Sequence, residues 1–88
     1  MSQSMSVHFL FVNETGARRH SEIEVAGLCG YADKCREALE WQQAKPDRTV
    51  KTWAQGLLRT TTVTETLITN LRRRGEQIEQ QYGEVSHV

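Results

Sequence analysis

Residues 49–82 read TVKTWAQGLLRTTTVTETLITNLRRRGEQIEQQY, and this stretch has the most regular hydrophobic pattern in the chain. Apolar and threonine residues return every three or four positions, the spacing that places residues on one buried side of a helix. This spacing predicts one long helix over residues 48–82, about 50 Å in length if it is unbroken. The residues on this apolar stripe are Val50, Trp53, Leu57, Thr60, Thr64, Leu67, Leu71 and Ile78.

Two places within the stretch favour an interruption of the helix. Residues 60–64 are all β-branched, and such side chains lose rotamer freedom in a helix, so a break near residues 60–62 is the alternative to one continuous helix. The run Arg72–Arg74 followed by Gly75 is also typical of a helix end, because basic side chains and a left-handed glycine suit the last turn. Ile78 keeps the spacing beyond Gly75, so we extend the helix to residue 82.

A shorter helix is predicted over residues 31–44. Ala32, Cys35 and Leu39 return at helical spacing on one face, with charged residues between them. Pro46 ends this helix, because the residue before a proline is disfavoured in helical geometry. Two helices joined by so short a link are expected to lie antiparallel.

The N-terminal part of the chain predicts a β-hairpin over residues 6–26. Residues 7–12 are rich in β-formers and apolar on both alternating faces, which suits a strand covered on both sides or paired across an interface. Residues 21–25 alternate as a half-exposed second strand does. Ser21 and Glu24 also have the spacing of a helix capping box, so residues 21–30 are either strand or helix.

These elements define the predicted fold, which is α+β but mainly α: a short N-terminal β-hairpin followed by an antiparallel helical hairpin with a long C-terminal helix. The 88 residues form one small domain, residues 1–88. The helix over residues 31–44 spans about 21 Å, against about 50 Å for the helix over residues 48–82. Half of the apolar stripe is therefore expected to lack cover from within the chain.

The uncovered half of the stripe predicts that the chain acts by binding protein. The expected function is a small non-enzymatic interaction module, a regulator, adaptor or inhibitor, whose partner is a second copy of the chain or a different protein. The protein is then a homodimer or part of a hetero-complex. The alternative is a small DNA- or RNA-associated regulator that uses the basic cluster Arg72–Arg74. The residues predicted to bind the partner are Trp53, Leu57, Leu67, Leu71, Arg72, Arg73, Arg74 and Ile78.

Composition disfavours several other classes of function. The 11 basic and 11 acidic residues balance, whereas a dedicated nucleic-acid binder has a marked basic excess. Cys29 and Cys35 lack the close pair spacing of a zinc site, and no catalytic motif is present, so we expect no metal, no cofactor and no enzyme activity. The sequence contains no pattern of an export signal or a membrane span, which predicts a cytoplasmic protein without membrane contact.

Overall fold

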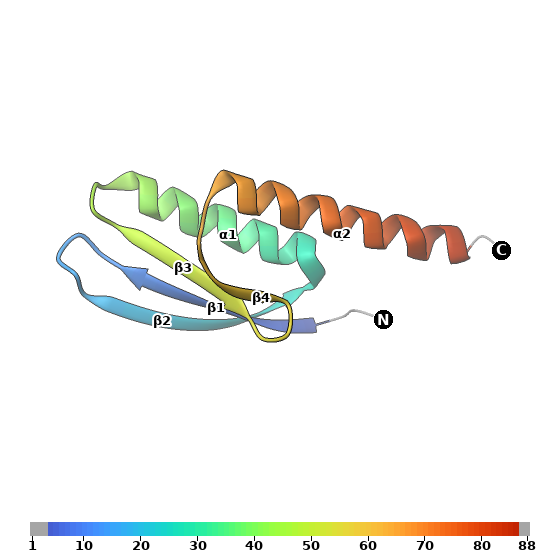
Figure 1. Cartoon of the computed structure of the whole chain (residues 1–88), viewed down its shortest axis with the longest axis horizontal. Helices are drawn as coiled ribbons and strands as arrows, with labels where there is room; N and C mark the ends of the chain where they lie inside the picture. The colour runs from blue at the N-terminus through green and yellow to red at the C-terminus, as the bar shows by residue number, and fades with distance from the viewer. Residues whose placement is uncertain (1–3, 87–88) are drawn as a thin grey trace.

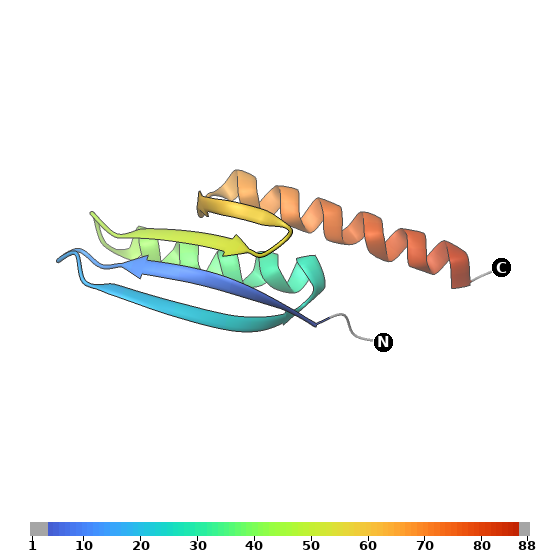
Figure 2. The same cartoon turned by 60° about the horizontal axis from the view of Figure 1, so that its bottom comes forward.

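The structure is a computed structural model that describes residues 4–86, with side chains described as far as residue 78. Within these residues the chain forms one four-stranded antiparallel sheet and two helices, and the strand order across the sheet is β2-β1-β3-β4. Both helices lie on the same side of the sheet (Figures 1 and 2). In chain order the elements are β1 (Ser4–Val12), β2 (Arg18–Ala26), α1 (Gly27–Ala44), β3 (Thr49–Ala54), β4 (Leu58–Thr62) and α2 (Glu65–Ser86).

The predicted mainly α fold with a helical hairpin is wrong, because residues 49–62 form a β-hairpin and not the first half of a long helix. Val50, Thr52 and Ala54 point inward from β3 and are buried, which is the alternation of a strand. Gly56 has a φ of 79°, and Leu57 N donates to Ala54 O at 3.0 Å, so a tight turn joins the two strands. Residues 60–62, three of the β-branched residues that weakened the helix prediction, lie in β4.

The helix α2 begins at Glu65, later than the predicted start at residue 48 and beyond the predicted break near residues 60–62. Thr64 caps it, since its Oγ1 accepts a hydrogen bond from Leu67 N at 3.1 Å. The helix then continues through Gly75 to Ser86. The predicted C-terminal helix is therefore present over its second half only.

The region left open between strand and helix, residues 21–30, is divided between the two. Strand β2 runs to Ala26, and α1 starts at Gly27, four residues before the predicted start at residue 31. Gly27 has a φ of 83°, a left-handed conformation that lets the chain turn from the sheet edge directly onto the inner face. The helix ends at Ala44, the predicted position before Pro46.

The core lies between the inner face of the sheet and the two helices. Its strand residues are Val7, Phe9, Val25, Val50 and Ala54, and α1 and α2 add Tyr31, Cys35, Leu39, Ile68 and Leu71 among others. One polar network crosses this core: Tyr31 Oη lies 2.6 Å from Thr52 Oγ1, which donates to His8 O at 2.7 Å. Burial raises the pKa of Tyr31 to about 12, so its hydroxyl remains a donor over the physiological pH range.

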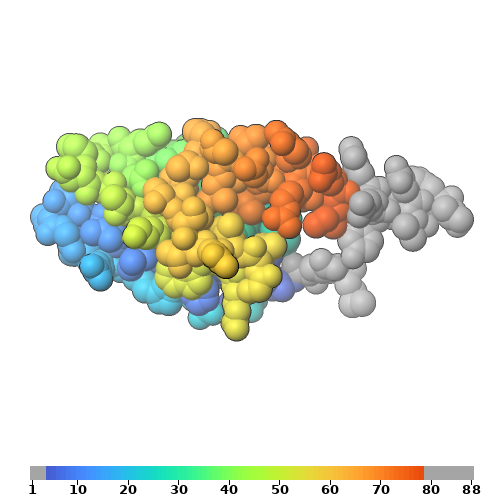
Figure 3. All heavy atoms as spheres, in the orientation of Figure 1, coloured from blue at the N-terminus to red at the C-terminus, as the bar shows by residue number. Residues whose placement is uncertain are grey.

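The two helices differ in how far they follow the sheet. Helix α1 crosses the inner face of the sheet. Helix α2 packs beside α1 and extends past the N-terminal end of α1 (Figure 1). In the space-filling view, β4 and the first half of α2 form one continuous surface (Figure 3). Neither of the two helices among the described residues is long and apolar enough to cross a membrane.

Candidate functional site

The outer face of the sheet carries the even-numbered residues of β1 and the residues paired with them. His8 lies between Glu22 on β2 and Trp53 on β3, and Leu10 lies between His20 and Lys51. Because directly opposed residues of an antiparallel pair point to the same side, these side chains share one face. Both described helices lie on the other face, so neither covers this one (Figure 2).

Three rings gather at the centre of this outer face. His8 and His20 lie with their ring centroids 5.2 Å apart, and the indole of Trp53 is 5.1 Å from His8 and 5.6 Å from His20. The three ring planes agree to within 8°, and His8 Nδ1 lies 3.0 Å from His20 Nε2, so one imidazole donates a hydrogen bond to the other. We call His8, His20 and Trp53 the ring cluster.

Charged residues of both signs surround the ring cluster. On the acidic side, Glu22 Oε2 accepts a hydrogen bond from Ser6 Oγ at 3.1 Å and lies 3.7 Å from His8 Nε2. Glu24 Oε2 accepts from Ser4 Oγ at 3.1 Å. On the basic side, Arg18 and Lys51 are exposed toward the hairpin end of the same face. The outer face thus has an aromatic centre, one acidic end and one basic end.

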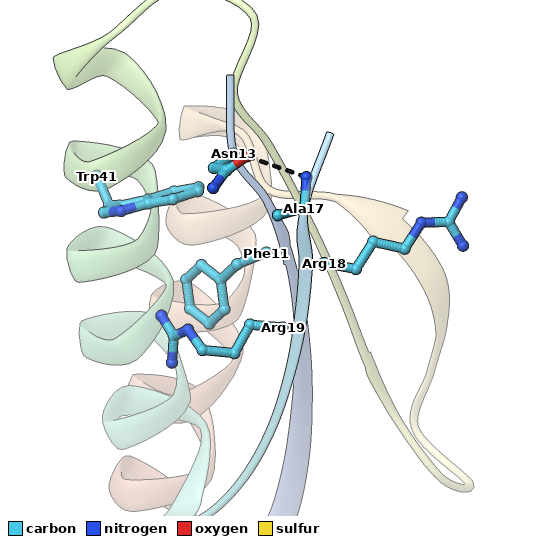
Figure 4. A pocket seen from close by; sticks show the side chains of 6 residues that line it. All are labelled: Phe11, Asn13, Ala17, Arg18, Arg19 and Trp41. Atoms are coloured by element: carbon cyan, nitrogen blue, oxygen red, sulfur yellow. Dashed lines mark hydrogen bonds between the residues drawn. The ribbon is translucent and has the colours of Figure 1, made fainter. Parts of the chain in front are cut away.

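A second feature is a shallow pocket beside the β1–β2 turn (Figure 4). Its volume is about 170 Å³, below the roughly 300 to 1,000 Å³ typical of small-molecule sites. Phe11 meets Trp41 edge to face at 5.3 Å, and the Arg19 guanidinium lies 4.3 Å from the Phe11 ring centroid. The lining side chains thus contact one another and the space left between them is small, so we do not assign a ligand to this pocket. The lining residues are Phe11, Asn13, Ala17, Arg18, Arg19 and Trp41.

The predicted partner-binding residues do not form one surface. Leu71 is 3% exposed, and Leu57 and Leu67 are partly buried against the same core, so these three side chains already have cover from within the chain. Trp53 lies on the outer face instead. Ile78 is 41% exposed on the part of α2 beyond Gly75. A partner role for these residues remains a prediction, but the reason given for the three leucines, an uncovered stripe, is wrong.

The arginines of the predicted basic cluster have different environments. Arg72 is half-buried, and its Nη2 donates to Asp33 Oδ1 of α1 at 3.1 Å. Arg73 and Arg74 are exposed to solvent. Because α2 belongs to the helical layer, the cluster lies on the opposite side of the sheet from the ring cluster. The two features therefore do not share one face of the molecule.

The remaining chemistry of the described residues is sparse. Within residues 4–86 as described, no group of three or more His, Cys, Asp or Glu side chains could hold a metal ion. Burial raises the pKa of the Cys35 thiol to about 12, which opposes thiolate formation. Cys29 and Cys35 both belong to α1, so the sheet separates their thiols from the imidazoles of His8 and His20.

Sequence reasoning missed His8 and His20 as site residues. Residues 7–12 are apolar on both faces, so β1 was expected to be covered on both sides or paired across an interface, and the half-buried position of His8 on an open face could not be inferred. Trp53 was named, but as part of a helix stripe. One signal for the two histidines was present in the sequence. Once the turn at Gly16 is fixed, the hairpin register places Leu10 opposite His20, so the even-numbered residues of β1 and β2 share one face.

The described residues together define a small α+β protein with a two-layer arrangement and a ring-bearing sheet face that neither described helix covers. Comparisons with protein-family models, with curated proteins and with solved structures found no match to this chain.

Proposed function

We propose that this chain is a small non-enzymatic protein-binding module of the cytoplasm, a regulator, adaptor or inhibitor, and that it binds its partner through the outer face of the sheet. The observation that supports this is Trp53, a half-buried indole held parallel to His8 and His20 on a face that α1 and α2 leave uncovered. Tryptophan is enriched among the residues that dominate binding energy at protein interfaces. A large ring already fixed by its neighbours also loses little side-chain entropy on binding.

The charges around the ring cluster indicate the chemistry of the partner. Protein interfaces combine an apolar or aromatic centre with a polar rim, and the outer face has this arrangement. Leu10 and Val12 add half-buried apolar area next to the rings. Glu22 and Lys51 place opposite charges on either side of the centre. The surface therefore suits a protein that presents exposed apolar side chains with charges of both signs around them.

The test is a comparison of three tagged baits in extracts of the native host: the wild type, Trp53→Ala and Glu76→Ala. Glu76 is exposed on α2 and serves as the control on the other side of the sheet. Proteins retained by the wild type and Glu76→Ala but lost with Trp53→Ala are then purified for titration calorimetry. We expect Trp53→Ala to weaken that binding by about 2 kcal/mol or more, roughly 30-fold.

Folding is checked separately, so that loss of binding is not confused with loss of structure. Trp53 lies outside the core, and circular dichroism of Trp53→Ala should match that of the wild type. A folded Trp53→Ala variant that retains every partner of the wild type would show that the outer face is not the binding surface.

A second candidate function is binding of single-stranded nucleic acid, which one observation favours. Aromatic rings on an open sheet face can stack unpaired bases, and Lys51 and Arg18 lie on the same face as the ring cluster. Glu22 and Glu24 oppose this function, because they place two carboxylates on that face. A gel-shift assay with 20-nucleotide RNA and DNA of mixed sequence at 20 and 200 mM salt distinguishes the candidates. Strong binding at low salt that Trp53→Ala abolishes would support this second function.

A further inference from the structure

Strand β2 is an edge of the sheet, and its outward backbone groups can be identified from the hairpin. Asn13 N donates to Ala17 O at 3.0 Å, which makes Asn13 and Ala17 a hydrogen-bonded pair next to the turn. Hydrogen-bonded and non-hydrogen-bonded pairs alternate along an antiparallel ladder. The odd-numbered residues of β2 therefore direct their N–H and C=O groups toward β1. Those of Arg18, His20, Glu22 and Glu24 point away from the sheet.

The side chains of these four residues form a charge pattern with its own symmetry. All four lie on the outer face, and in order along the strand they are basic, imidazole, acidic and acidic. Ser21 is the midpoint of the series, with His20 and Glu22 one residue away and Arg18 and Glu24 three residues away. A strand with this pattern is complementary to a second copy of itself turned end for end.

We propose that two copies of the chain pair antiparallel along β2, with Ser21 of one copy opposite Ser21 of the second copy, to form a continuous eight-stranded sheet. In this register Arg18 lies opposite Glu24 of the second copy, and His20 lies opposite Glu22 of the second copy. The two-fold axis repeats each pair, so four complementary pairs form on one face. Each opposed pair also joins residues whose backbone groups point outward, so the backbone ladder continues across the interface.

Other registers are less favourable for the same residues. Moving the second copy by one step of the ladder in one direction places Glu22 opposite Glu22, and like charges directly opposed are destabilising. Moving it in the other direction places His20 opposite His20 of the second copy. Glu24 then lies past Arg18 of the second copy and has no basic residue opposite it. The charge pattern therefore selects a single register for the pair.

Existing contacts of the carboxylates are compatible with this pairing. Glu22 and Glu24 accept their hydrogen bonds from Ser6 and Ser4 through Oε2, and a carboxylate has a second oxygen, Oε1, that can accept from a donor of the second copy. On the inner face, Arg19 lies opposite Ile23 of the second copy, and its aliphatic stem can cover that half-buried side chain. The axis is perpendicular to the sheet, so both ring clusters lie on the same side of the pair.

The pairing does not rest on the proposed protein partner, and the full chain alone tests it. The mass of the wild type is measured by light scattering or sedimentation from about 5 μM to 1 mM, beside Arg18→Glu, Glu24→Arg, the double variant R18E/E24R and the control Glu76→Arg at an exposed position of α2. Each single β2 variant turns two attractive pairs into repulsive ones and should raise the dimer Kd at least about tenfold. The control should leave it unchanged.

Recovery of pairing then identifies the register. The double variant exchanges the charges and should dimerise within about threefold of the wild type. An equimolar mixture of Arg18→Glu and Glu24→Arg should form a heterodimer, because each provides the charges that the other lacks. A wild type that stays monomeric at 1 mM would overturn the proposal. So would a dimer that the single variants leave intact, or one that neither the double variant nor the mixture restores.

Discussion

Gly75 shows how one residue sets the distance between the two helices. A glycine directly after three arginines is typical of a helix end, yet α2 continues through Gly75. The reason is the packing of the two helices. A Cβ added at Gly75 would lie 2.7 Å from Cys29 Sγ, 3.0 Å from Cys29 N and 3.2 Å from Leu28 Cβ. The missing side chain therefore lets α2 approach the first turn of α1.

We expect Gly75→Ala to destabilise the protein. Alanine gains about 1 kcal/mol in helix propensity, but the contacts of its Cβ include backbone atoms and force the helices apart, which costs about 1 to 3 kcal/mol. Urea denaturation should show a net loss of about 1 kcal/mol, with Gln77→Ala on the exposed side as the control.

A double variant tests the mechanism of that loss. Adding Cys29→Ala removes the nearest atom, Sγ, but leaves Cys29 N and Leu28 Cβ in place. The second substitution should therefore recover part of the lost stability. A stabilised Gly75→Ala variant would mean that propensity outweighs packing at this crossing.

At the scale of the element, the sequence predicted the structure where one periodicity dominates. The first strand of the hairpin follows from the β-formers of residues 7–12, the second from the alternation of residues 21–25, and the end of α1 before Pro46 from proline chemistry. Residues 49–62 are misleading because they fit both the helical and the strand period. Val50, Trp53 and Leu57 have helical spacing. The strand alternation is hidden because one of its inward residues, Thr52, is polar, and its burial depends on the contact with Tyr31. That contact cannot be known before the fold is known.

The candidate site was less predictable than the fold. Its rings come from three strands, and β3 was expected to be helical, so the position of Trp53 next to His8 had no basis in the predicted elements. The charge symmetry of residues 18–24 was present in the sequence. It acquired meaning only when β2 was found at the edge of the sheet.

The β1–β2 turn contacts the loop between α1 and β3, and we expect this contact to be sensitive to acid. Glu14 in the β1–β2 turn accepts a hydrogen bond from Arg48 Nε at 2.9 Å and lies 3.4 Å from Lys45 Nζ. The hydrogen bond from Arg48 is the main cause that lowers the pKa of Glu14 from 4.5 to about 2. Because folding lowers the pKa of Glu14, the charge of Glu14 contributes fully to stability above about pH 4.5. This contribution is lost as the pH falls to about 2.

Glu14→Gln should therefore lower the urea midpoint at pH 6, and its difference from the wild type should shrink steadily between about pH 4.5 and pH 2. Glu76→Gln, on an exposed part of α2, is the control and should follow the wild type at each pH. A difference that is the same at pH 6 and pH 2 would show that the Glu14 charge is not the cause.

For the whole molecule, pairing along β2 predicts that stability depends on protein concentration. Association that involves the folded state and not the unfolded state raises the unfolding temperature as the protein concentration rises. Calorimetry of the wild type at 10 and 300 μM should show an increase of a few degrees, whereas Arg18→Glu should show a smaller one. Equal unfolding temperatures for the wild type at both concentrations would argue against pairing in this range.

The two edges of the sheet are unequal, and this has a consequence for growth of the assembly. Strand β4 has only five residues, its register with β3 shifts between Thr52 and Ala54, and α2 begins three residues after it ends. A short, irregular edge is a poor template for another strand. In a pair joined at β2, both remaining edges of the described sheet are β4 strands, so we expect further strand addition to be disfavoured and association to stop at two copies.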